Sequence, residues 1–120
     1  MTTYSIPPSE WRATLDRFSL THQGWPVTIE ILSPAMGAQP EVIELPLFGI
    51  SLSAPNDDPA IAVTMSRREP DHITHVVEHV RRIYVDHEAG EAFAVETADG
   101  TRTLLRFLKP AADAAFANAH

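Results

Sequence analysis

The sequence contains no cysteine, and this absence excludes several kinds of chemistry. Without a thiol, the chain can form no disulfide, offer no thiolate ligand to a metal and supply no cysteine nucleophile. Proteins of the reducing cytosol commonly lack disulfides. We therefore expect a cytoplasmic protein.

Glycine is scarce, with only five residues in the chain. Their spacing rules out the glycine-rich fingerprint of a dinucleotide site and the phosphate-binding loop. The nucleophile elbow G-x-S-x-G is also absent, and the spacing of serine, histidine and aspartate suggests no triad. We therefore expect no organic cofactor and assign no catalytic residue.

Basic residues are few: the chain has nine lysines and arginines against sixteen acidic residues, and its net charge is -7. Such a chain repels phosphate backbones and anionic lipids. No apolar run approaches the roughly 20 residues of a membrane span, and the first residues do not resemble a signal peptide. We expect a soluble protein that binds neither nucleic acid nor membranes.

The remaining composition is that of an ordinary globular protein, and 120 residues match the usual length of one domain. We expect a single domain over residues 1–120. It would consist of an N-terminal arm (1–8), a helix (9–22), a β domain (25–108) and an alanine-rich tail (109–120).

The expected helix begins after two prolines. Ser9 is a good N-cap, and Glu10 lies in the first turn, where the helix dipole favours negative charge. Trp11, Leu15 and Phe18 follow at i, i+4 and i+7 and form one apolar stripe. We expect this stripe to be buried against the sheet.

The clearest local signal is a hairpin centred on Asp99-Gly100. A turn with Gly100 in the left-handed region would pair Thr97 with Thr101. Four apolar side chains then share the face that we expect to be buried: Phe93, Val95, Leu105 and Phe107. The opposite, exposed face carries Glu96, Arg102 and Arg106.

Three further segments also read as strands. Apolar and other residues alternate over 25–32 and 61–65, which is the period of a half-buried strand. Over 41–53 the apolar residues change face partway. Since Gly49 follows Phe48 there, we expect a bulge that returns the later apolar residues to the core.

Residues 71–88 are ambiguous. Their apolar residues recur at helical spacing, but valine, isoleucine, threonine and tyrosine, which favour strands, dominate the segment. Periodicity alone leaves both a helix and two strands open.

Several blocks of the sequence resemble those of a family of small bacterial proteins catalogued as a domain of unknown function. They are GWPVTIE (24–30), GAQ (37–39), LPLFGIS (45–51), DHITH (71–75) and DGTRTLLRF (99–107). The resemblance implies no activity, cofactor or catalytic residue. It implies an extended conformation in the ambiguous segment. In the family a proline stands near the position that Val80 occupies here, and a proline there would interrupt a helix. We therefore favour two strands, at 72–78 and 82–88.

The sharpest chemical motif is H-x-x-E-H, formed by His75, Glu78 and His79. On a helix both histidines could bind zinc and the glutamate could polarise a bound water. On a strand the two histidines would still share a face and could form a weaker metal site, but Glu78 would point away. The alternative is that these are solvated or hydrogen-bonded histidines. Further ligands could come from Asp71, His72 and His87.

The fold that we expect is mainly β, with an N-terminal helix followed by a six- to seven-stranded, mostly antiparallel sheet that curls into a small barrel or sandwich. The leading functional hypothesis is a non-enzymatic binding or interaction module, with self-association included. The alternative is a small metal-dependent hydrolase that uses His75, Glu78 and His79.

Overall fold

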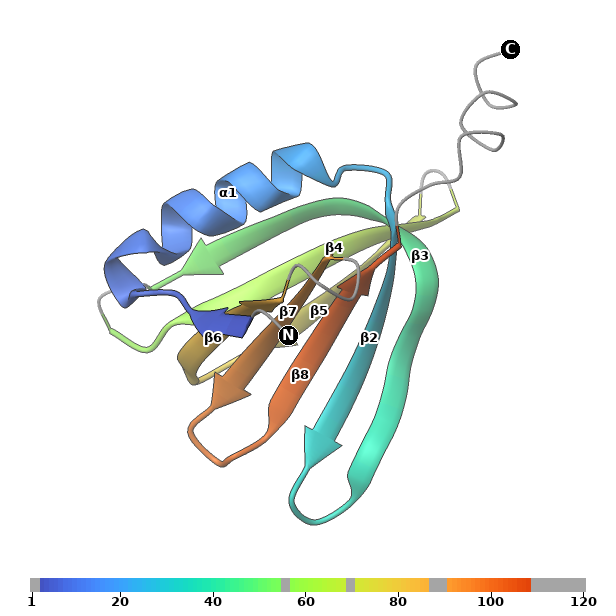
Figure 1. Ribbon diagram of the computed structural model, residues 1–120. Helices are drawn as coiled ribbons and strands as arrows, with labels where there is room; N and C mark the ends of the chain where they lie inside the picture. Colours follow the sequence, from blue (N-terminus) through green and yellow to red (C-terminus); the bar gives the residue numbers. More distant parts are fainter. Residues whose placement is uncertain (1–2, 55–56, 69–70, 87–90, 109–120) are drawn as a thin grey trace.

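The computed structural model describes residues 3–54, 57–68, 71–86 and 91–108. Within them one helix packs against a single antiparallel sheet of eight strands (Figure 1). The strands are β1 (Thr3–Ser5), β2 (Pro26–Ser33), β3 (Gly37–Ser53), β4 (Ala60–Arg68), β5 (Asp71–Val77), β6 (Val80–Asp86), β7 (Glu91–Thr97) and β8 (Arg102–Phe107).

The strand order is β1-β6-β7-β8-β2-β3-β4-β5. The expected fold class is confirmed: an N-terminal helix precedes a mainly antiparallel β structure. The sheet is nevertheless open, with β1 and β5 at its two ends, and it does not close into a barrel. It also has one strand more than the upper expected number. The extra strand is β1, whose three residues are too few to show an alternating pattern.

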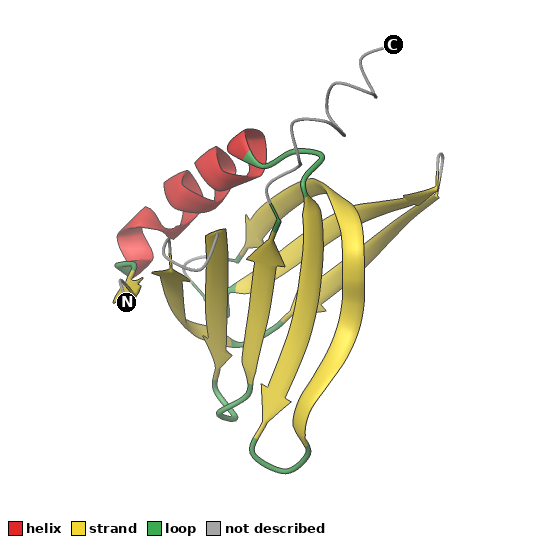
Figure 2. Ribbon diagram, turned by 45° about the vertical axis from the view of Figure 1, so that its right-hand side comes forward, coloured by secondary structure: helices red, strands yellow, loops and turns green. Residues whose placement is uncertain are grey.

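The helical region begins with a 3-10 turn, η1 (Pro8–Glu10), and continues as α1 (Trp11–Thr21). The expected N-cap is wrong: Ser9 lies inside the turn, and no side chain caps either helix. The turn is closed by the amide of Glu10, which donates to the carbonyl of Pro7 at 2.8 Å. As expected, Trp11, Leu15 and Phe18 are buried, and α1 lies across one side of the curved sheet (Figure 2).

Strand β3 lies between β2 and β4, and its first part pairs with β2 while its last part pairs with β4. Its register with β4 shifts between Leu47 and Gly49, which confirms the expected bulge. Phe48 consequently stays 52% exposed, whereas Ile50 and Leu52 are buried. The bulge therefore allows β3 to contribute buried side chains to the core both before it, at Leu47, and after it, at Ile50 and Leu52.

The ambiguous segment is extended, so the two-strand interpretation is confirmed. Strand β5 ends at Val77 and β6 begins at Val80, and only Glu78 and His79 separate them. His79 adopts a positive φ of 58°. The two strands do not pair with each other, because β5 pairs with β4 and β6 with β1 and β7.

The hairpin of β7 and β8 has the expected register, with Glu96 opposite Arg102. Gly100 has a φ of 86°, and the amide of Thr97 donates to the carbonyl of Thr101 at 3.0 Å. The expected apolar face is buried: Phe93, Val95, Leu105 and Phe107 are each at most 2% exposed. Phe18 of α1 contacts this face, with its ring centroid 4.1 Å from that of Phe93.

Candidate functional site

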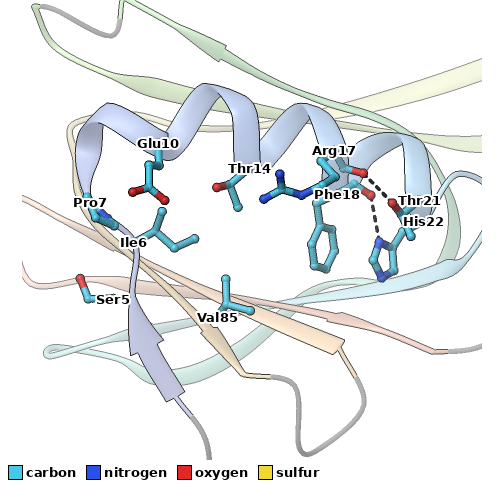
Figure 3. A pocket seen from close by; sticks show the side chains of 10 residues that line it. All are labelled: Ser5, Ile6, Pro7, Glu10, Thr14, Arg17, Phe18, Thr21, His22 and Val85. Atoms are coloured by element: carbon cyan, nitrogen blue, oxygen red, sulfur yellow. Dashed lines mark hydrogen bonds between the residues drawn. The ribbon is translucent and has the colours of Figure 1, made fainter.

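A cavity of about 450 Å³ lies between α1 and the end of the sheet formed by β1 and β6 (Figure 3). Its lining comprises Ser5, Ile6, Pro7, Glu10, Thr14, Arg17, Phe18, Thr21, His22 and Val85. Cavities that bind small molecules usually measure about 300–1,000 Å³. The size is therefore that of a small-molecule site.

The helical wall of the cavity is a polar stripe. Glu10, Thr14, Arg17 and Thr21 follow one another at intervals of four, three and four residues, so they share one face of the helical segment. This stripe runs beside the buried stripe of Trp11, Leu15 and Phe18. Because the apolar stripe packs on the sheet, the polar stripe beside it faces the cavity.

The opposite wall is held by the N-terminal segment. The amide of Ile6 donates to the carbonyl of Ile83 on β6 at 2.9 Å, and the indole Nε1 of Trp11 donates to the carbonyl of Ile6 at 2.9 Å. These two bonds tie Ile6, the residue that follows β1, both to β6 and to the start of α1. Ile6 and Val85 are both buried and supply apolar surface to the cavity.

One end of the cavity is formed by aromatic rings. His22, only 3% exposed, stacks on Phe18 with 3.8 Å between the ring centroids. Its Nδ1 lies 2.9 Å from the carbonyl oxygen of Phe18, which can only accept, so Nδ1 carries the proton. Trp25 meets the His22 ring edge-on at 4.4 Å. These contacts fix the imidazole in one orientation.

The charged groups of the cavity are Glu10 and Arg17. Both side chains reach from the helix toward the cavity, from different turns (Figure 3). Arg17 is exposed, and no acidic residue in the described part of the chain forms an ion pair with it. An unpaired guanidinium beside apolar surface suits a carboxylate or phosphate that is attached to an apolar body.

A second hollow of about 380 Å³ lies on the outer face of β6, β7 and β8. Its lining comprises Tyr84, Asp86, Ala92, Phe93, Ala94, Arg102, Leu104 and Arg106. The guanidinium of Arg102 is already 3.0 Å from the carboxylate of Glu96 and lies 5.8 Å from the centre of the Tyr84 ring. An anion would therefore have to compete with Glu96 for this arginine.

The two histidines predicted to bind a metal lie in different settings. His75 is half-buried on β5, opposite Val63, on the same side as Ile73 and Val77. His79 is exposed and follows the end of the strand, so the two histidines do not share a strand face. No group of three or more potential ligands gathers among the described residues. A metal bound by His75 and His79 stays a prediction.

The structure pairs His79 with a residue that the motif did not name. Its Nδ1 lies 2.6 Å from Oδ2 of Asp58, and Arg81 donates to Oδ1 of the same carboxylate at 3.3 Å. Desolvation acts to raise the pKa of Asp58, but the hydrogen bonds from His79 and Arg81 outweigh it and hold that pKa below its ordinary value.

The other proposed ligands are also dispersed. Glu78 is exposed in the turn, and the ring of His72 meets that of Phe48 edge-on at 4.6 Å. His87 lies outside the described residues. Sequence reasoning missed the cavity, although the spacing of Glu10, Thr14, Arg17 and Thr21 was a readable signal for its helical wall.

Comparisons with known proteins give a family but no activity. In the part of the chain that the structure describes, no helix combines the length and apolar character needed to cross a membrane. An uncharacterized protein from the bacterium Aquifex aeolicus (strain VF5) is 34% identical over 113 residues, covering 92% of this chain and 96% of that protein. No solved structure matches. The model described as a family of unknown function (DUF5335) matches residues 2–115, and the chain belongs to this family.

Proposed function

We propose that the chain is a non-enzymatic binding module for a small organic anion with an apolar body. The observation that carries the proposal is the cavity between α1 and the β1–β6 end of the sheet, where an unpaired arginine stands beside buried apolar side chains. The guanidinium of Arg17 would bind the anionic group, and Ile6, Phe18 and Val85 would contact the apolar part.

The chemistry of the lining supports this division of roles. A planar guanidinium can donate two parallel hydrogen bonds to one carboxylate, which gives orientation as well as affinity. Hydroxyl groups of Ser5 and Thr14 stand at the same cavity and can donate further bonds. Each Å² of apolar ligand surface removed from water adds roughly 25 cal/mol. Charge and apolar contact would therefore act together.

A matched pair of ligands tests the proposal. Benzoate and benzamide have nearly the same shape, but only benzoate is charged. In amide NMR titrations we expect benzoate to shift the signals of residues that line the cavity, with those of Thr14, Arg17 and Val85 among them, and benzamide to bind at least about tenfold more weakly, because a charged hydrogen-bonded pair adds about 1.5–3 kcal/mol.

Variants of two arginines on the same helix provide the control. Arg17→Gln should abolish the preference for benzoate, whereas Arg12→Gln should keep it, because Arg12 is exposed and does not line the cavity. The proposal fails if benzoate shifts signals elsewhere, or if both variants bind benzoate as the wild type does.

The alternative function, a metal-dependent hydrolase centred on His75, Glu78 and His79, has less support. Its mechanism needs a helix that stacks both histidines on one face with the glutamate beside them, and the segment is instead two strands joined by Glu78 and His79. Metal analysis of protein purified without a histidine tag tests it. Stoichiometric zinc that His75→Ala and His79→Ala each release would restore this alternative.

A further inference from the structure

The two ends of the sheet are unequal. At one end β1 has three residues, and at the other β5 has seven. Strand β5 pairs with β4 along one side, and no described strand pairs with its other side. A strand in this position presents a row of unpaired N–H and C=O groups, which is a template for pairing with another chain.

Strand β5 lacks the features that usually protect such an edge. Proteins shorten edge strands or place proline, lysine or a bulge in them. Between Asp71 and Val77 there is neither proline nor lysine, and the one irregularity in its pairing lies at its first residue. Apolar surface also adjoins the edge, because Val76 and Phe48 are each 52% exposed and Phe48 packs against His72.

The sequence of β5 is compatible with a second copy of itself. An antiparallel pair with its two-fold axis at Thr74 would set Thr74 against Thr74 of the partner subunit. The other opposed positions would be His72 with the partner's Val76, Ile73 with the partner's His75, and Asp71 with the partner's Val77. Directly opposed residues of an antiparallel pair point to the same side, so each of these pairs lies on one face of the combined sheet.

Charge also favours this arrangement. Each copy carries a net charge of -7, which opposes contact over most of the surface. Along β5 the only acidic residue is Asp71, and it would face an apolar valine rather than another acid. A Thr–Thr contact already occurs in this sheet, where the hydroxyl groups of Thr64 and Thr74 are 3.1 Å apart.

We propose that β5 is the docking edge for a second copy of this chain, and that two sheets join across an antiparallel β5–β5 pair centred on Thr74. The interface is isologous, so the same residues of both copies contact each other across the two-fold axis. The main-chain hydrogen bonds supply affinity, as in other complexes formed by strand addition. None of the residues that line the cavity belongs to β5, so this proposal does not depend on ligand binding.

A charge exchange at the two-fold axis tests the register. Thr74 is exposed, and a residue on the axis meets its own copy. In sedimentation equilibrium of the full chain, Thr74→Lys and Thr74→Asp should each raise the dimer Kd by up to about fivefold, because like charges would stand directly opposite. An equimolar mixture should recover dimers, since lysine would then face aspartate. The same two changes at Ser51, an exposed position on β3, which pairs on both sides, should leave the Kd unchanged.

A single introduced cysteine gives a second test that leaves the strand nearly unaltered. The chain has no cysteine, so Thr74→Cys would carry its only thiol. Directly opposed residues of an antiparallel pair have Cα atoms about 4.5–5.5 Å apart, a separation that a disulfide can span. Mild oxidation should crosslink Thr74→Cys into dimers and leave Ser51→Cys monomeric. A wild-type chain that stays monomeric at about 1 mM, where even a dimer with a Kd of about 1 mM would be substantially populated, or equal crosslinking of both variants, would overturn the proposal.

Discussion

Two chain reversals in this molecule contrast sharply: the turn between β7 and β8, and the corner between β5 and β6. The first joins strands that pair with each other, and Gly100 supplies its positive φ. The second joins strands that do not pair, and a histidine, His79, takes the positive φ. The first is built from local turn chemistry, whereas the second depends on residues far away in the sequence.

The partners of each reversal show this difference. At the first, Oδ1 of Asp99 accepts from the hydroxyl of Thr97 at 2.8 Å and from the amide of Thr101 at 3.0 Å. At the second, the amide of Val80 donates to the carbonyl of Pro59 at 2.9 Å, and the amide of Ala98 donates to the carbonyl of His79 at 3.0 Å. Local bonds specify a hairpin, while bonds between distant segments fix a corner that no short sequence motif encodes.

The largest expected effect follows from breaking the packed face of the β7–β8 hairpin. Phe107→Ala should lower the free energy of unfolding by about 3–5 kcal/mol, because the side chain is 2% exposed and its loss leaves a cavity. Phe48→Ala is the matched control near β5: with Phe48 52% exposed, the change should cost clearly less, about 1 kcal/mol. Urea unfolding measures both, and equal losses would show that the two faces are packed alike.

A smaller effect separates the two reversals themselves. Gly100→Ala should cost about 1–3 kcal/mol, because alanine is strained at positive φ. An added Cβ would find its nearest atom, Cγ of Pro34, at 3.6 Å, so the cost comes from the backbone and not from a clash. His79→Gly relieves that strain but removes the contact with Asp58, so it should change stability by less than about 1 kcal/mol. Thermal unfolding of both variants checks this, and a neutral Gly100→Ala would contradict the local account of the hairpin.

The smallest effect concerns two aspartates whose pKa values are both lowered. At Asp99 the lowering comes first from the backbone bond with Thr101, and then from side-chain bonds with Thr97 and Thr101. At Asp58 it comes from His79 and Arg81, against desolvation. Since each folded-state pKa is depressed, each group contributes stability that is present above the ordinary value of 3.8 and is lost as the pH falls through the folded pKa.

Salt should distinguish the two aspartates in a carboxyl NMR titration. Ion pairs between exposed groups are screened by salt, but the bonds that the Asp99 carboxylate accepts from the neutral Thr97 hydroxyl and Thr101 amide are screened much less. Raising the salt concentration should therefore move the pKa of Asp58 upward, toward 3.8, and leave that of Asp99 lowered. Equal upward shifts would mean that both reversals depend on charge.

The same contrast explains what the sequence could predict. The apolar stripe of α1, the bulge at Phe48-Gly49 and the register of the β7–β8 hairpin depend on neighbours within a few residues, and all three are confirmed. The openness of the sheet, the short strand β1 and the contact between Asp58 and His79 depend on pairing between distant segments. Period and turn signals carry no information about such pairing.

The candidate site follows the same division. Its helical wall, with Glu10 and Arg17 on one stripe, can be read from the sequence. Its other wall exists because β1 pairs with β6, with Tyr4 opposite Val85. That pairing joins positions 81 residues apart, so no short stretch of the sequence indicates it. The cavity therefore becomes visible only in the folded chain.

The pairing of β2 with β8 bears on how the protein is made. Val27 stands opposite Phe107, so β2 finds one of its two neighbours only in β8, the last of the described strands. During synthesis on the ribosome, β2 emerges long before β8. Until β8 has been made, Phe18 in the apolar stripe of α1 lacks its contact with Phe107. Exposed apolar surface and unpaired strand edges make such nascent chains prone to aggregation. The core therefore stays incomplete until β8 has been made, and slow translation between β2 and β8 lengthens the time for which this apolar surface is exposed.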